Sequence, residues 1–116
     1  MGNPMDATRG TPEVFAREAL TRKEAGALLV DVREPWEFEE VRAPGALLLP
    51  LGEFTSRYSE LPQERDLLII CHSGYRSMQA ATFLLRHGYS QVANVVGGME
   101  EWEYAGLPIE RGKPQG

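Results

Sequence analysis

The stretch CHSGYRS, residues 71–77, brings together side chains that could act jointly in chemistry. It holds the only cysteine of the chain and one of its two histidines, and four residues separate Cys71 from Arg76. It follows the apolar run LLII, and a helical pattern begins near Arg76. The stretch, named here the cysteine loop, is therefore predicted to connect a buried strand to a helix.

A loop of this kind can hold its cysteine as a thiolate, the nucleophilic form. Gly74 permits a positive φ, which lets successive backbone N–H groups point toward one place. The helix that begins near Arg76 turns its positive end toward the same place. The planar guanidinium of Arg76 suits oxyanions, and Ser73 and Ser77 can donate hydrogen bonds. We interpret Cys71 as the nucleophile of an anion-binding loop; the alternative is a buried structural cysteine that ends a strand.

Alternating strands and helices are predicted to position this loop. Four short apolar runs are nearly continuous, as is typical of strands buried on both faces: 27–32, 46–51, 66–71 and 92–96. Residues 13–17 are a candidate edge strand. Helical patterns lie between the runs, at 21–27, 35–41, 51–61, 76–88 and 99–106. The alternation predicts an α/β sandwich around a parallel sheet, in which ligands bind beyond the carboxyl ends of the strands.

Length and composition indicate one globular domain. The chain has 116 residues, of which 42% are hydrophobic and 25% are charged. We predict a flexible tail at 1–12, one domain at 13–110 and a second flexible tail at 111–116. The formal net charge of −5 argues against non-specific binding to nucleic acid or to an anionic membrane. With no apolar targeting segment and no long apolar run, we expect a cytoplasmic protein.

The single cysteine also limits the metal and disulfide chemistry that is open to the chain. It excludes an internal disulfide. Together with His72 and His87, it falls short of the four ligands of a structural zinc site. We therefore expect no bound metal.

The cysteine loop resembles the active-site loop of the rhodanese family of sulfurtransferases, whose pattern is Cys-x-x-Gly-x-Arg-Ser. Three further segments resemble that family in the same order: LLVDVREPWEF, APGALLLPL and VVGGMEEWEYAGLP. The resemblance covers about residues 13–109. It implies a three-layer sandwich with a central five-stranded parallel sheet, in a single-domain form.

The resemblance also implies a role for each residue of the site. Cys71 would carry a persulfide, the backbone of 72–76 would form an anion cradle, and Arg76 would hold the anionic donor. Asp31 and Arg33 fall on the segment that in the family lies under the loop, where they would orient it. The expected cradle residues are His72, Ser73, Gly74, Tyr75, Arg76 and Ser77. Because an ionised thiol needs no base, His72 is expected to face solvent and shape the rim of the site; the alternative is a general base.

The implied reaction moves a sulfane sulfur from thiosulfate or a similar donor to cyanide or a thiol, without a metal or an organic cofactor. A protein is also possible as the sulfur acceptor, and we expect a monomer or a weak homodimer. One alternative is a sulfur-carrier or protein-interaction module without turnover. Another is a rhodanese-like phosphatase or arsenate reductase, but these have one more residue between the cysteine and the arginine. The shorter loop of this chain therefore favours sulfur transfer.

Several other residues are predicted to be structural. Val41 and Arg42 stand where the family usually has Gly-His, which predicts different packing at 41–43 and an extra positive charge near the site. Trp36 and Trp102 are interpreted as core or half-buried packing residues; the alternative is a stacking platform. A group of glutamates is interpreted as a solvated helix face or, alternatively, as a docking surface for a basic partner: Glu34, Glu37, Glu39 and Glu40.

Overall fold

Short apolar segments form a parallel sheet in the computed structural model, which describes residues 10–114. The sheet has five strands in the order β1-β5-β4-β2-β3, and every neighbouring pair is parallel. This confirms the predicted fold class. The strands are β1 (Glu13–Val14), β2 (Leu28–Asp31), β3 (Leu47–Leu48), β4 (Leu67–Ile70) and β5 (Val92–Val95).

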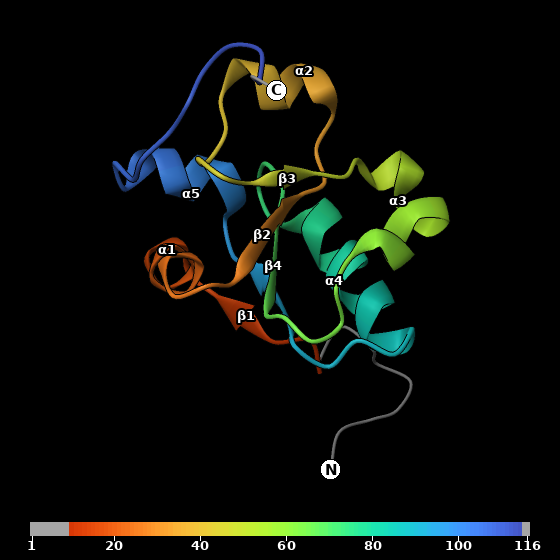
Figure 1. Ribbon diagram of the computed structural model, residues 1–116. Helices are drawn as coiled ribbons and strands as arrows, with labels where there is room; N and C mark the ends of the chain where they lie inside the picture. Colours follow the sequence, from red (N-terminus) through yellow and green to blue (C-terminus); the bar gives the residue numbers. More distant parts are fainter. Residues whose placement is uncertain (1–9, 115–116) are drawn as a thin grey trace.

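Helices cover both faces of the sheet (Figure 1). They are α1 (Ala16–Glu24), α2 (Pro35–Glu40), α3 (Leu51–Arg57), α4 (Tyr75–Arg86) and α5 (Gly98–Tyr104), with a 3₁₀ turn at Tyr58–Glu60. Successive strand residues point to opposite faces. Leu68 and Ile70 pack toward α1 and α5, whereas Leu67 and Ile69 pack toward α3 and α4. The uninterrupted apolar sequence of β4 is thus explained by burial on both sides.

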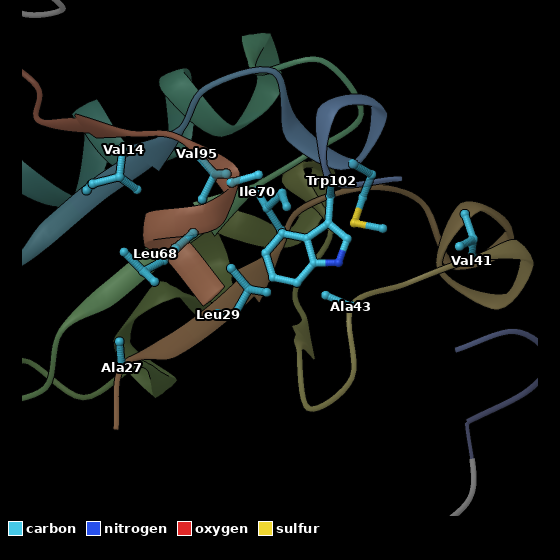
Figure 2. Packing of buried hydrophobic residues seen from close by; sticks show 13 residues of the cluster. Val14, Ala27, Leu29, Val41, Ala43, Leu68, Ile70, Val95 and Trp102 are labelled. Atoms are coloured by element: carbon cyan, nitrogen blue, oxygen red, sulfur yellow. The ribbon is translucent and has the colours of Figure 1, made fainter. Parts of the chain in front are cut away.

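Trp102 anchors α5 in the core between that helix and the sheet. It is the largest fully buried side chain, and Figure 2 shows it beside Leu29, Ile70 and Ala43. Its indole N–H donates a hydrogen bond to the carbonyl of Pro108 at 2.8 Å, so its one polar atom is satisfied. The packing role predicted for Trp102 is confirmed.

The prediction that Trp36 is a packing residue was wrong, because its side chain is 66% exposed. Helix α2 has only six residues and buries Phe38 instead. Two residues along a helix correspond to a rotation of about 200°. A helix that buries Phe38 therefore turns Trp36 toward solvent.

The first helix and the third strand differ from their predicted ranges. Helix α1 spans Ala16–Glu24, not 21–27, and it buries Ala16 and Ala19. These small side chains leave only a weak apolar stripe in the sequence. Strand β3 has two residues where 46–51 was predicted, because Pro50 cannot donate to a ladder and Leu51 begins α3.

Arg42 ties the C-terminal segment to α2, where the trace of this segment ends in Figure 1. Its buried guanidinium donates to the carbonyls of Phe38 at 3.1 Å and Gly112 at 2.6 Å. It also lies 3.5 Å from a carboxylate oxygen of Glu110.

The N-terminal end of the described chain contacts α4. The Thr11 hydroxyl lies 2.8 Å from that of Thr82.

Residues 1–9 and 115–116 of the two predicted tails lie outside the described residues. Within 10–114, no helix is both long and apolar enough to cross a lipid bilayer.

Candidate active site

Three loops meet at the carboxyl edge of the sheet because their strands are neighbours. Strand β4 lies between β2 and β5, and Asp31 pairs with Ile70 in the parallel register. The cysteine loop follows β4, the segment with Asp31 and Arg33 closes β2, and Gly97 follows β5 closely. The edge where ligands bind in α/β sheets therefore carries the residues that the sequence analysis singled out.

The Cys71 sulfur is buried and faces donors from its own loop. The residue is 1% exposed. The backbone N–H of Gly74 donates to Sγ at 3.0 Å, and the Ser77 hydroxyl donates to it at 3.2 Å. Gly74 adopts a φ of 110° as the N-cap of α4, which is the conformation that brings its N–H over the sulfur. These two donors would stabilise a negative charge on the sulfur.

Helix α5 holds the other side of the cysteine loop. The backbone N–H of Met99 donates to the carbonyl of Cys71 at 2.8 Å, and that of Glu100 donates to the carbonyl of His72 at 3.0 Å. These bonds bind the loop carbonyls on the side of α5. The first turn of α5 thereby fixes the loop in the conformation that turns Gly74 N–H to the sulfur.

Asp31 and Arg33 form a buried ion pair at the end of β2. The Arg33 Nη2 lies 2.8 Å from the Asp31 carboxylate and donates to the carbonyl of Val41 at 2.7 Å. The Asp31 carboxylate also accepts the backbone N–H of Arg33 at 3.0 Å. The pair braces the turn between β2 and α2 beside the cysteine loop; that it orients the loop stays a prediction.

Arg76 binds a carboxylate that the sequence analysis assigned to solvent. Its Nη1 and Nη2 donate to the two oxygens of Glu37 at 2.7 and 2.9 Å. The Glu37 side chain is 13% exposed, so its interpretation as part of a solvated face was wrong. The hydrogen bonds from Arg76, opposed by burial, lower the pKa of Glu37 from 4.5 to about 2. The same pairing raises the pKa of Arg76.

The rim of the site is open and partly aromatic. A cavity of about 290 Å³ is lined by Trp36, Glu37 and His72, among others. The His72 side chain is 56% exposed, and its Nε2 lies 3.3 Å from a carboxylate oxygen of Glu100. Tyr75 is 81% exposed. His72 and Tyr75 are thus placed where they can shape access to the loop.

No group of three or more His, Cys, Asp or Glu side chains within residues 10–114 could hold a metal ion.

The Glu37–Arg76 pair predicts a specific pH dependence of stability. Because the pKa of Glu37 is lowered in the folded state, its contribution is complete above pH 4.5 and is lost as the pH falls toward 2. After allowance for the partial exposure of the pair, we expect Glu37 to contribute about 2 kcal/mol to the free energy of unfolding. Chemical denaturation of wild type and Glu37→Gln should show a stability difference of this size at pH 7. The difference should shrink as the pH falls; a constant difference would contradict the prediction.

Two contacts of the site join distant segments of the chain and could not be predicted from the sequence. Glu37 and Arg76 are 39 residues apart in the chain. The hydrogen bonds from α5 to the cysteine loop depend on Gly98 lying against the carbonyls of Cys71 and His72. The Gly-Gly pair at the start of α5 was the one visible signal, since glycine often marks a close backbone approach.

Comparison with known proteins identifies similar sequences and a similar fold. The family described as "Rhodanese-like domain" matches residues 15–105. A sulfurtransferase of Allochromatium vinosum is 46% identical over 82 residues, 71% of this chain and 77% of that protein. Thiosulfate sulfurtransferase GlpE of Actinobacillus succinogenes is 39% identical over 87 residues, 72% of this chain and 76% of that protein. Some relatives are longer: matches to two others span 40% and 50% of their length.

A solved structure has the same arrangement of strands and helices. The crystal structure of a rhodanese-related protein from Thermoplasma volcanium superposes with a TM-score of 0.80 at 26% sequence identity. The match covers 85% of this chain and 97% of that one.

Proposed function

Because this chain belongs to the family of rhodanese-like domains, we propose that it is a sulfurtransferase that moves the outer sulfur of thiosulfate to a thiophilic acceptor. The observation that carries the proposal is the buried Cys71 sulfur with hydrogen-bond donors from Gly74 and Ser77. A relative named thiosulfate sulfurtransferase supports thiosulfate as the donor.

The reaction consists of two displacements at sulfur. In the first, the Cys71 thiolate attacks the outer sulfur of thiosulfate; the S–S bond to the sulfonate breaks and sulfite leaves with the electron pair. In the second, cyanide or a thiolate attacks the outer sulfur of the persulfide, and the Cys71 thiolate is released. Each step conserves charge and needs no oxidant, and covalent catalysis of this type gives ping-pong kinetics.

The cradle donors suit the persulfide as well as the thiolate. The negative charge of a persulfide lies mainly on its outer sulfur, which would extend from Cys71 toward the donors of the loop. Cys71 is the only cysteine of the chain, so no internal thiol can discharge the persulfide. An external acceptor, either a small molecule or a protein, must therefore complete the cycle.

Intact mass spectrometry tests the proposal directly. After incubation with thiosulfate, wild type should gain one sulfur atom and lose it on addition of cyanide, whereas Cys71→Ser should gain none. A persulfide that neither cyanide nor small thiols discharge would instead support a sulfur carrier that serves one protein partner. No gain, with Cys71 still open to alkylation, would contradict thiosulfate as the donor.

A further inference from the structure

Arg76 is the only arginine of the cysteine loop, yet its charge is already compensated. Both terminal nitrogens of its guanidinium donate to Glu37, at 2.7 and 2.9 Å. This bidentate geometry is the strongest that an arginine and a carboxylate form. An incoming anion therefore encounters a neutral ion pair. Without Glu37, the cysteine loop would present an uncompensated positive charge.

Glu37 is itself held in place by the start of α2. Its Oε1 accepts the backbone N–H of Glu34 at 2.9 Å, and the Glu34 side chain accepts a backbone N–H in return. Pro35 occupies the first turn of the helix. The capping box thus holds the Glu37 carboxylate against the backbone of the β2–α2 turn. Because Arg76 binds this carboxylate, the turn also determines where the guanidinium lies.

Arg76 lies in the first turn of α4, between the two residues that donate to the Cys71 sulfur. The Gly74 N–H and the Ser77 hydroxyl reach Sγ at 3.0 and 3.2 Å, so the guanidinium is attached to the part of the loop that surrounds the sulfur. The hydrogen bond to Glu37 is the main cause that raises the pKa of Arg76. A full positive charge on Arg76 would therefore attract anions to the sulfur, whereas the neutral pair attracts them little.

We propose that Glu37 is a positioning residue for Arg76. By compensating the charge of Arg76, it determines how strongly the site selects incoming molecules by their charge. With the pair intact, the site accepts sulfur donors of low charge nearly as readily as dianions. This statement about donors rests on the proposed function; the statement about access to the thiol does not.

Glu37→Gln is the variant that separates charge from structure. Glutamine keeps an oxygen that can accept the N–H of Glu34, but it leaves the charge of Arg76 uncompensated. One unit charge at several ångströms in a partly solvated site changes the encounter with a monoanion by about three- to tenfold. Glu37→Asp retains the charge. Glu39→Gln removes one charge from the same helix, about 200° away around its axis.

The first measurement compares two alkylating agents with the same leaving group. We expect the ratio of the rate constants for Cys71 with iodoacetate and iodoacetamide to rise about three- to tenfold in Glu37→Gln. The rise should decrease with added salt. Glu37→Asp and Glu39→Gln should keep the ratio of wild type. An unchanged ratio in Glu37→Gln, or a thiol that reacts with neither agent, would overturn the proposal.

A second measurement applies the same logic to sulfur donors. Thiosulfate is a dianion, and methanethiosulfonate is a monoanion that delivers its outer sulfur with methanesulfinate as the leaving group. Glu37→Gln should form the persulfide faster with thiosulfate relative to methanethiosulfonate, whereas a purely structural defect would slow both equally. If neither donor loads wild type while the alkylation ratio still shifts, the proposed function fails and the role of Glu37 stands.

Discussion

Cys71→Ser is expected to lower the rate of thiocyanate formation from thiosulfate and cyanide by at least about 10⁴-fold. A serine hydroxyl is not ionised at neutral pH, and its oxygen cannot form a persulfide. The substitution is otherwise small, and the Gly74 N–H and the Ser77 hydroxyl that donate to Sγ can donate to Oγ. The loss should therefore appear in turnover, measured as thiocyanate, and not in the fold.

The control for this result is the unfolding of the variant. Cys71→Ser should unfold within about 2 kcal/mol of wild type, since one buried group is replaced by a similar one whose hydrogen bonds can be kept. Wild type alkylated at Cys71 should be as inactive as the variant. Residual turnover of one part in ten or more in a preparation free of other sulfurtransferases would exclude Cys71 as the sulfur-bearing residue.

The features that were predicted correctly are local in the sequence. The strands are short apolar runs, and the cysteine loop combines a glycine that permits positive φ with the start of a helix. Segments that bury small side chains were predicted less accurately. Helix α1 buries alanines, which give little contrast between its two faces, and it was placed five residues too late.

The contacts that complete the site are set by tertiary structure. Glu37 looks like its neighbouring glutamates in the sequence, and only the meeting of α2 with the cysteine loop gives it Arg76 as a partner. Trp36 and Phe38 share a short helix, and which of them is buried depends on the rotation of that helix about its axis. Neither choice is encoded in a window of a few residues.

Gly98→Ala should be among the most destabilising single substitutions near the site. A Cβ at this position would lie 2.3 Å from the carbonyl oxygen of Cys71 and 2.7 Å from that of His72. Both neighbours are backbone atoms, which cannot move aside as a flexible side chain can. Gly98 also has a φ of 54°, which alone costs alanine about 1 kcal/mol. We expect a total loss of at least about 3 kcal/mol, measured by chemical denaturation.

Gly106→Ala is the matched control, just beyond the other end of α5. It separates the free-energy cost of placing alanine at a positive φ from the cost of its clash with neighbouring backbone atoms. Gly106 has a φ of 71°, but apart from its own atoms and those of its two chain neighbours no heavy atom lies within 4 Å of where its Cβ would be. Its substitution should therefore cost only about 1 kcal/mol and leave the alkylation rate of Cys71 unchanged. Gly98→Ala must push α5 away from the loop carbonyls, so its surviving folded fraction should also show an altered Cys71 alkylation rate. If both variants lost the same stability and kept the same rate, the contact between Gly98 and the loop would not be what holds the cysteine in place.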